Sequence, residues 1–265
     1  MTAPTPIDLA HRAMEAAPGD DAARLRFYER VADNELFLML VREPEAEDIE
    51  PEIFDVADGR FVLAFDRIER LADFAGRPVP YVAIPGRALA GLLSGQGIGL
   101  GLNLEVAPSS LLIPAEAMSW LTETLTDTHG GLVADEAQIE GLHPPAGLPE
   151  ALVVGLDAKL ASAAGHAPMA FLAGVEYAGG GKGHLLAFID AAPAAEAALQ
   201  RAVAEALVFS GIEAGALDVG FFTASAPIAA RLARVGLRFD LPQPETETLQ
   251  RAAPGSDPDK PPRLR

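Results

Sequence analysis

A glycine-rich stretch, residues 95–112, contains the residues whose types and spacing best suit a binding site. It reads GQGIGLGLNLEVAPSSLL, with apolar residues at every second position from Ile98 to Val106. In a β-strand, alternate residues point to opposite faces, so one face would be aliphatic and the other nearly bare. Glycine weakens a strand interior, so its repetition here indicates that a helix, another chain or a ligand packs close against the backbone.

Two interpretations of the bare face stay open at this point. In the first, the glycines let a helix pack tightly inside the domain, which is the commoner use of glycine in a strand. In the second, they form the floor of a pocket for a small metabolite such as an amino acid, and the protein is a sensor or an enzyme. The residues of this candidate binding surface are Gly97, Gly99, Gly101, Asn103, Gln96, Arg87 and Ser109.

Neither glycine cluster has the context of a phosphate-binding loop. The dinucleotide fingerprint G-x-G-x-x-G lies between a strand and a helix, whereas the glycines at 95–101 alternate and continue as a strand. The run GGGKG at 179–183 lacks the Ser or Thr that follows the lysine of a P-loop, because Gly183 and His184 come next. It is typical of a hairpin tip, so no nucleotide cofactor is expected.

Catalytic and metal-binding constellations are not expected either. Ser94 has Leu92 and Gln96 where G-x-S-x-G requires glycines, and Ser109 lies in an Ala-Pro-Ser-Ser turn. No two histidines have the i, i+2 or i, i+4 spacing that places two metal ligands on one face. The five histidines are His11, His129, His143, His166 and His184. We therefore expect no catalytic residues, no metal and no cofactor, and a protein that is not an enzyme.

Composition narrows the partners and the location. The formal net charge of −18 disfavours nucleic acid and anionic membranes, because both are bound by clustered Lys and Arg. Cysteine is absent, which removes disulfides, thiolate metal sites and thiol catalysis. No apolar run approaches the roughly 20 residues that span a bilayer, and no secretion signal is expected in the first residues. A cytoplasmic protein is the resulting expectation.

The elements that must position these residues follow from hydrophobic periodicity and turn signals. Helices are expected at 7–17, from 20 or 21 onward, 66–74, 87–93, from 114, 193–210 and 225–235. Strands are expected at 35–43, 53–56, 60–65, 81–84, 98–106, 111–113, 152–156, 169–177, 184–190, 217–223 and 237–241. Asp58-Gly59 and the run AGGGKG at 178–183 predict two hairpins.

The pattern divides the chain into two domains. We predict a first domain at 1–140, a Pro- and Gly-rich linker at 141–150, a second domain at 151–241 and a flexible tail at 242–265. Both halves mix strands and helices without a regular β-α-β alternation. The expected fold class is therefore α/β (α+β), with each domain a mixed or mostly antiparallel sheet covered by helices.

Four stretches of the first half are distinctive: FYERVADNELFLML, DGRFVLAFDRIERLADFAG, PYVAIPGRALAGLL and GQGIGLGLNLEVAPSSLLIPAEAMSWL. Together they resemble the N-terminal domain of the SseB family, the enhanced serine sensitivity proteins. The second half, from LVVGLDAKL through FLAGVEYAGGGKGHLLAFID to GLRFDLP, resembles the family's C-terminal domain. The resemblance covers about residues 26–241 and supplies no catalytic or cofactor residues.

The missing catalytic constellations, the acidic composition and the resemblance together favour a non-enzymatic protein-interaction or regulatory protein with an unknown protein partner. A homo-oligomer stays open, as does the alternative of a metabolite sensor or enzyme. The family name is shared with a translocon filament subunit of type III secretion, so a secretion-associated role is a further alternative by name alone. The chain has none of the long heptad helices expected of such a filament.

Overall fold

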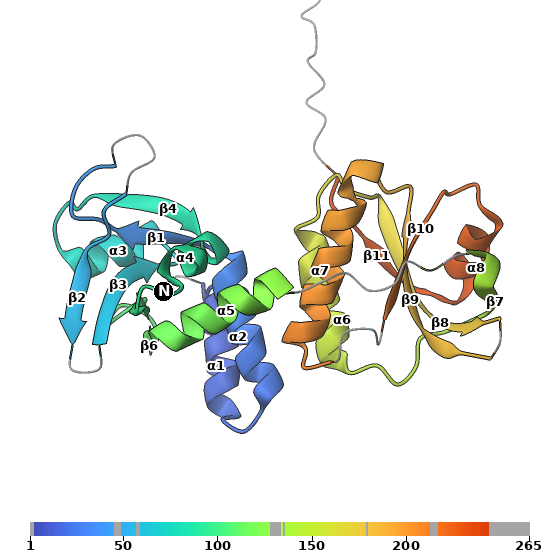
Figure 1. Cartoon of the computed structure of the whole chain (residues 1–265), viewed down its shortest axis with the longest axis horizontal. Coiled ribbons are helices and arrows are strands. Elements are labelled where there is room, and N and C mark those ends of the chain that lie inside the picture. The colour runs from blue at the N-terminus through green and yellow to red at the C-terminus, as the bar shows by residue number, and fades with distance from the viewer. Residues whose placement is uncertain are drawn as a thin grey trace, which may run out of the picture.

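The computed structural model describes residues 3–44, 49–56, 59–127, 134, 136–178, 180–212 and 217–243. These residues form two units, each a mixed β-sheet with helices on both faces (Figure 1). The first unit comprises the elements between residues 6 and 127, and the second those between residues 136 and 240. The predicted fold class is confirmed. Asp58, His129 and residues 244–265 of the predicted tail lie outside the described residues.

The first unit contains five helices and six strands among its described residues. The helices are α1 (Pro6–Ala16), α2 (Asp21–Asp33), α3 (Ile68–Ala75), α4 (Gly86–Leu93) and α5 (Ala115–Asp127). The strands are β1 (Glu35–Met39), β2 (Ile53–Val56), β3 (Gly59–Phe65), β4 (Tyr81–Pro85), β5 (Ile98–Leu102) and β6 (Leu111–Ile113). The sheet order is β4-β1-β3-β5-β6, with β2 paired to β3. Strands β3 and β5 pair in parallel, and the other strand pairs described in this sheet are antiparallel.

Local signals in the sequence fix the ends of these helices. Thr5 and Asp8 form a capping box at the start of α1, and the Asp20 side chain accepts a hydrogen bond from the Ala22 N–H at the start of α2. Gly76 ends α3 in the left-handed region at φ 61°, which glycine adopts without steric cost. The boundaries of the predicted elements are therefore set by capping chemistry.

The two faces of the first sheet have different covers. Helices α1, α2, α4 and α5 pack on one face, where Phe27, Leu89 and Leu121 meet the strand residues Leu36 and Leu100. Helix α3 covers part of the other face through a smaller apolar cluster around Leu63, Phe65 and Leu71. Because side chains alternate along a strand, successive residues of β3 pack into the apolar clusters on opposite faces of the sheet.

The second unit has the same layered build. Its helices are η1 (Glu136–Gln138), α6 (Glu150–Ala161), η2 (Pro193–Ala195), α7 (Glu196–Phe209) and α8 (Pro227–Val235). Its strands are β7 (Ile139–His143), β8 (Met169–Tyr177), β9 (Lys182–Ile189), β10 (Asp218–Phe222) and β11 (Leu237–Asp240). The sheet order is β10-β9-β8-β11, with β7 paired to β8. Helices α6 and α7 pack on one face and α8 on the other.

Two elements of the second unit differ from the sequence prediction. The strand predicted at 152–156 is wrong, because these residues lie in α6. In a helix, Leu152, Leu156 and Leu160 recur every four residues, and all three are buried in the core between α6 and the sheet. The first residues of the predicted linker, 141–143, are the end of β7, which pairs with β8 across the predicted domain boundary.

The two sheets share an arrangement of four strands. In both, a central antiparallel pair (β1 with β3, β8 with β9) has an antiparallel strand on one side and a parallel strand on the other. In the first unit the antiparallel edge strand, β4, comes before the parallel strand β5. In the second unit the parallel strand β10 comes before the antiparallel strand β11. The four strands therefore have the same spatial order and relative directions in both sheets, but the two outer strands follow each other in the opposite order along the chain.

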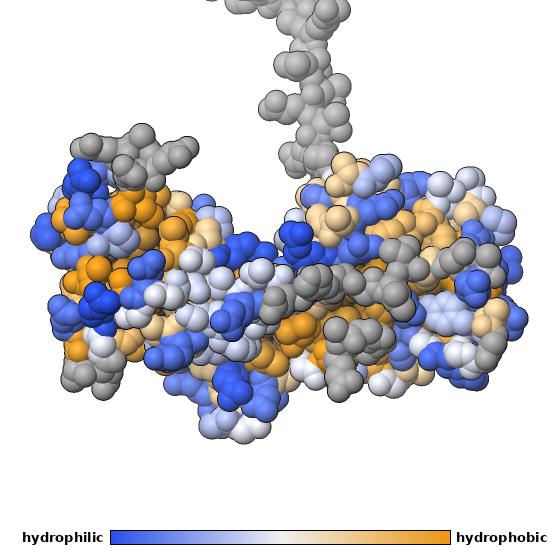
Figure 2. All heavy atoms as spheres, in the orientation of Figure 1, coloured by the Kyte–Doolittle hydropathy of each residue, from blue (hydrophilic) through white to orange (hydrophobic). Residues whose placement is uncertain are grey.

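The surface mixes hydrophobic and hydrophilic areas. Figure 2 shows hydrophobic residues gathered beside the strands of the first unit and again where the two units meet. A notch between the units in the upper part of this view is lined by hydrophilic residues. None of the helices among the described residues has the length and hydrophobicity needed to cross a membrane.

Candidate functional site

The glycine-rich strand is shorter than predicted. Strand β5 ends at Leu102, and the chain then turns through Asn103 (φ 50°) and Glu105 (φ 63°). The predicted strand is therefore wrong beyond residue 102, because two residues in the left-handed region cannot continue an extended strand. Leu104 and Val106, expected to alternate along the strand, instead pack with the apolar cluster on the α3 side of the sheet.

The bare face of β5 is filled by side chains of the neighbouring strand. A Cβ atom on Gly99 would lie 2.5 Å from Phe61 Cε1 and 2.5 Å from the Ile113 carbonyl oxygen. One on Gly101 would lie 2.5 Å from Leu63 Cδ2. Close packing therefore accounts for these two glycines. The neighbour is strand β3, whereas the first of the two interpretations of the sequence placed a helix there.

Replacing Gly99 by valine is expected to lower the free energy of unfolding by about 2 kcal/mol, because the added Cβ overlaps a backbone oxygen that cannot move without disturbing β6. Urea denaturation followed by circular dichroism measures the change. The matched control is Gly91→Ala on α4, where no atom lies within 4 Å of the added Cβ. This control is expected to raise stability by up to about 1 kcal/mol. Unchanged stability of Gly99→Val would mean that the face is open.

The other predicted site residues do not join the two glycines. Gln96 and Gly97 lie in an exposed turn, where the Gln96 carbonyl oxygen accepts a hydrogen bond from Arg60 Nη2 at 3.1 Å. Arg87 lies on α4, which packs on the opposite face of the sheet from Gly99 and Gly101. The grouping of all seven residues into one surface is therefore wrong, because the sheet separates them.

Asn103 and Ser109 do come together, at the buried end of β5. Asn103 Nδ2 donates to Ser109 Oγ at 2.9 Å, and Ser109 Oγ donates to Asp8 Oδ1 at 2.6 Å. Asn103 Oδ1 accepts from the Asp66 backbone N–H at 3.0 Å. The positive φ of Asn103 thus turns the chain and aims its amide at both partners.

Arg70 on α3 completes this network. Its Nη2 donates to Asp8 Oδ2 at 2.5 Å, and its Nη1 donates to Asp66 Oδ1 at 2.7 Å. Thr5 Oγ1 donates to the second oxygen of Asp66 at 2.5 Å. We call these residues the Asp8–Arg70 network: Thr5, Asp8, Asp66, Arg70, Asn103 and Ser109.

The electrostatics of this network keep both main partners charged. Burial raises the pKa of the Asp8 carboxyl, but hydrogen bonds from Arg70, Ser109 and Thr5 lower it by more, so the pKa lies far below its ordinary range. Burial lowers the pKa of Arg70, and Asp8 and Asp66 raise it above its ordinary value. Neither group changes its charge near neutral pH, so this pair supports structure and does not exchange protons.

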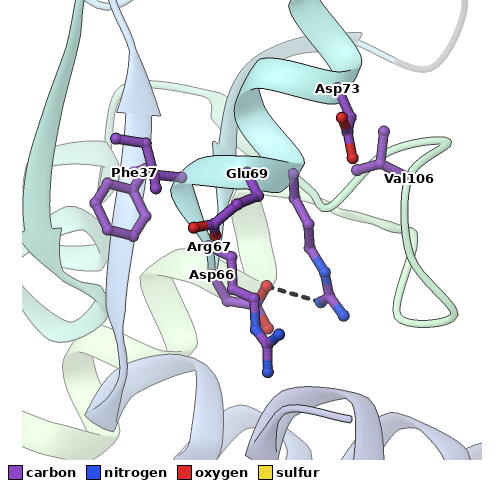
Figure 3. Close-up of a pocket in the computed structure, with 8 residues that line it drawn as sticks. Phe37, Asp66, Arg67, Glu69, Asp73 and Val106 are labelled. Carbon is purple, nitrogen blue, oxygen red and sulfur yellow. Dashed lines mark hydrogen bonds and ion pairs between the residues drawn. The ribbon is translucent and has the colours of Figure 1, made fainter. Parts of the chain in front are cut away.

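A pocket of about 700 Å³ opens next to the Asp8–Arg70 network (Figure 3). In this view Phe37 and Val106 lie on opposite sides, with Arg67 and Glu69 between them. Arg67 Nη2 donates to the Ala3 carbonyl oxygen at 2.8 Å, and Asp73 adds a second exposed carboxylate to the lining. Carboxylates and a guanidinium on one wall suit a small molecule that carries both charges. No group of three or more metal-ligating side chains occurs among the described residues.

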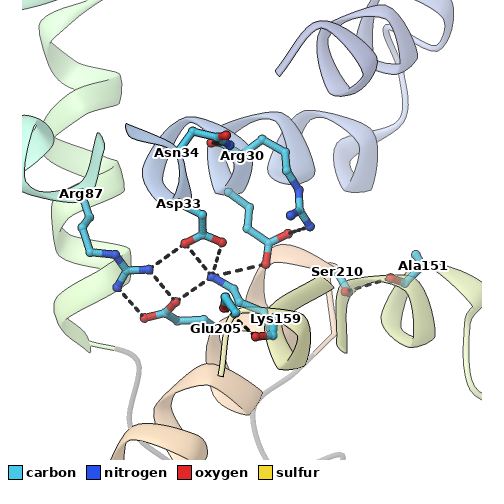
Figure 4. A network of polar contacts seen from close by, with 10 residues as sticks. Arg30, Asp33, Asn34, Arg87, Ala151, Lys159, Glu205 and Ser210 are labelled. Carbon is cyan, nitrogen blue, oxygen red and sulfur yellow. Dashed lines mark hydrogen bonds and ion pairs between the residues drawn. The ribbon is translucent and has the colours of Figure 1, made fainter. Parts of the chain in front are cut away.

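A second network joins the two units at α2, α6 and α7 (Figure 4). Lys159 on α6 is 5% exposed, and its Nζ donates to Asp33 Oδ2 at 2.7 Å and to Glu205 Oε2 at 2.8 Å. Glu29 Oε1 lies 3.6 Å from the same ammonium. One lysine of the second unit thus binds two carboxylates of the first and one of its own.

Two arginines complete this network. Arg87 Nη2 donates to Asp33 Oδ1 at 2.7 Å and to Glu205 Oε2 at 3.2 Å, and Arg30 Nη2 donates to Glu29 Oε2 at 3.3 Å. The residues of this junction cluster are Glu29, Arg30, Asp33, Arg87, Lys159 and Glu205. Its three carboxylates and three cations balance. Arg87, predicted beside the glycines, is here a link between units.

Burial disfavours the charged forms of Glu29 and Lys159 in the junction cluster, and nearby opposite charges counteract it. Burial raises the pKa of the Glu29 carboxyl, against the opposite effects of Lys159 and Arg30. It lowers the pKa of the Lys159 ammonium, but Asp33, Glu205 and Glu29 raise that pKa to above its ordinary value. The ammonium is therefore charged at neutral pH, and it lies between carboxylates of both units.

Sequence reasoning missed most of both networks. Asp8 has the capping-box spacing from Thr5, which marks the start of a helix and does not point to Arg70. Asp66 and Arg70 have only the i, i+4 spacing of an ordinary helical ion pair. Lys159 did offer a signal, because it falls between Leu156 and Leu160 on the buried side of α6, where a charge requires partners. That signal is visible only once residues 150–161 are recognised as a helix.

Among comparisons with known proteins, a match was found for the first unit alone. Neither a curated protein nor a solved structure matches the chain. A family model does match, over a range that runs from α1 into α5 and spans all six strands of the first sheet. The resemblance predicted for the first half is thereby confirmed: residues 11–120 match the SseB protein N-terminal domain.

Proposed function

We propose that this protein is a non-enzymatic interaction or regulatory protein of the enhanced serine sensitivity type, whose second unit is the C-terminal domain of the SseB family. The match to the SseB N-terminal domain supports the first half of this assignment. The resemblance of residues 152–241 to the family's C-terminal domain supports the other half. The family supplies no catalytic residues that could be carried over to this chain.

The observation that carries the proposal is that the ionisable side chains gathered by the fold bind one another. Asp8 is 1% exposed and accepts hydrogen bonds from Arg70, Ser109 and Thr5. Lys159 is enclosed by three carboxylates in the junction cluster. A general acid or base needs access to substrate and a pKa near the working pH, and neither group has them. Such networks suit a rigid scaffold that presents its surface to a partner.

The test is affinity purification with the full chain as bait, in an extract of its own cells, at 150 mM or more salt. We expect one partner in stoichiometric amount, because a non-enzymatic protein acts through a complex. The control bait is an unrelated protein of similar net charge, since a chain of charge −18 attracts basic proteins non-specifically. A monomeric chain that retains no stoichiometric partner would argue strongly against the proposal.

A metabolite sensor is the second candidate, and the pocket beside α3 favours it. This pocket of about 700 Å³ has carboxylates at Glu69 and Asp73 and a guanidinium at Arg67. A thermal-shift screen of amino acids and nucleotides tests this function. A ligand at 100 times its dissociation constant should stabilise the protein by roughly 2.7 kcal/mol. A saturable shift that disappears in Arg67→Ala would replace the interaction proposal with a sensor.

A further inference from the structure

An apolar groove crosses the boundary between the two units. It has a volume of about 340 Å³ and runs between α1, α2 and α6. Leu9 of the first unit and Val154 of the second both line it, and they are 52% and 53% exposed. Ala10 and Ala158 lie between them in the lining, so the floor is made of small and aliphatic side chains from both units.

The groove has a positively charged wall. Arg26 and Arg30, one helical turn apart on α2, both line it. Arg30 binds Glu29 of the junction cluster, whereas Arg26 forms no ion pair within the described part of the chain. In a chain with a net charge of −18, an apolar groove beside an unpaired guanidinium is unusual. It is complementary to a segment that combines an aliphatic side chain with carboxylates.

The chain itself carries such a segment at a suitable place. Residues 244–249 read Pro-Glu-Thr-Glu-Thr-Leu and follow directly on Gln243. Gln243 is held to the loop that follows α6, because its Nε2 donates to the Ala167 carbonyl oxygen at 3.1 Å. The preceding carbonyl, of Pro242, accepts from the Gly165 N–H at 3.0 Å. The segment therefore starts beside the helix that supplies Val154 to the groove.

The distances permit the connection. From Ala161, the last residue of α6, back to Val154 is about 11 Å along the helix axis, at roughly 1.5 Å per residue. Six extended residues reach about 20 Å. About 9 Å of this reach is left for the step from Gln243 to α6, so the segment can follow α6 backward and bring Leu249 to the groove.

We propose that residues 244–249 dock in this groove, with Leu249 against Leu9 and Val154 and the carboxylates of Glu245 and Glu247 facing Arg26 and Arg30. Docking would bury two of the most exposed aliphatic side chains of the described surface and would pair the free guanidinium. The proposal does not depend on the proposed function. It limits the predicted flexible tail to the residues beyond Leu249.

Hydrogen exchange of the full chain tests the proposal. Backbone amides of residues 245–250 are expected to exchange about tenfold more slowly than those of residues 255–265 in the same molecule. Val154→Lys and Leu249→Ser should each remove this difference. The matched control is Leu92→Lys, since Leu92 is 51% exposed on α4 and does not line the groove. Uniformly fast exchange from 245 to 265 in the unaltered chain, or protection that survives both variants, overturns the proposal.

A photo-crosslinking residue, p-benzoylphenylalanine, at position 154 distinguishes the occupants of the groove. A crosslink to residues 244–250 within one chain, independent of protein concentration, is the expected result. A product of twice the chain mass would assign the groove to a second copy and overturn the proposal, as would the absence of any crosslink to the tail. Either failure is separate from a failed search for a partner, because both experiments use the purified chain alone.

Discussion

Replacing Lys159 by methionine is expected to lower the free energy of unfolding by about 3–5 kcal/mol, the usual cost of removing one partner from a buried ion pair. The ammonium faces three carboxylates, and Glu29 and Glu205 are 1% and 3% exposed. Glu29 Oε1 has no hydrogen-bond partner among the described residues, so the ammonium 3.6 Å away is its main compensation. Methionine retains about the same side-chain volume and removes the charge together with the N–H donors to Asp33 and Glu205. Urea denaturation at pH 7.5 measures the loss.

The pH dependence of this variant gives an independent readout. The pKa of Glu29 is already raised by burial, and loss of the ammonium raises it further. A carboxyl whose folded pKa lies above its unfolded value contributes stability at low pH and loses it as pH rises through the folded pKa. The deficit of Lys159→Met should therefore be smaller at pH 5 than at pH 8.

The control for Lys159 is Lys182→Met. Lys182 is 75% exposed and pairs with Glu176 at the surface. Exposed ion pairs contribute about 0–1 kcal/mol, so this variant should unfold at nearly the same urea concentration as the unaltered chain. Equal and small losses in both variants would show that the junction cluster does not hold the units together.

The sequence predicted most of the fold because its elements carry local signals. The hairpins β2/β3 and β8/β9 follow from turn residues between alternating strands, and α7 from a stripe of helical period. Helix α6 was missed for a physical reason. Its LVVGL run is apolar at every position except Gly155, so period 2 and period 3.6 fit it equally well. Tertiary packing decides between the two periods, because as a helix this segment buries Leu152, Leu156 and Leu160 in one core cluster with the strands of the second sheet.

The candidate site was less accessible to sequence reasoning, since its partners are far apart in the chain. Asn103 and Ser109 belong to one glycine-rich stretch, and the structure joins them by a hydrogen bond that the sequence did not predict. Their third partner, Asp8, lies 101 residues before Ser109. Lys159 and Asp33 are separated by 126 residues. Contacts between residues this far apart have no local pattern, and tertiary packing brings the partners together, as where α6 places Lys159 beside Asp33 of α2.

Replacing Asp8 by asparagine is expected to lower the free energy of unfolding by about 3 kcal/mol at pH 7, because it leaves the buried guanidinium of Arg70 with one carboxylate in place of two. Asparagine has the same shape, and its oxygen can still accept from the Thr5 N–H, so the capping box at α1 survives. Its amide hydrogens, however, face the donors of Arg70. Urea denaturation with Asp73→Asn as the exposed control on α3 measures the effect, and the control should change by less than about 0.5 kcal/mol.

Acid is expected to reduce the difference in unfolding free energy between the unaltered chain and Asp8→Asn. The folded pKa of Asp8 lies below its unfolded value of about 3.9, so the stability that this carboxylate contributes is complete well above pH 4. It is lost as pH falls from about 4 toward the depressed folded pKa, where the carboxyl becomes protonated in both states. Asp8→Asn has no such group to titrate, so the two unfolding curves should approach each other between pH 4 and pH 2. A gap that stays constant over this range would mean that hydrogen-bond geometry, and not charge, makes Asp8 stabilising.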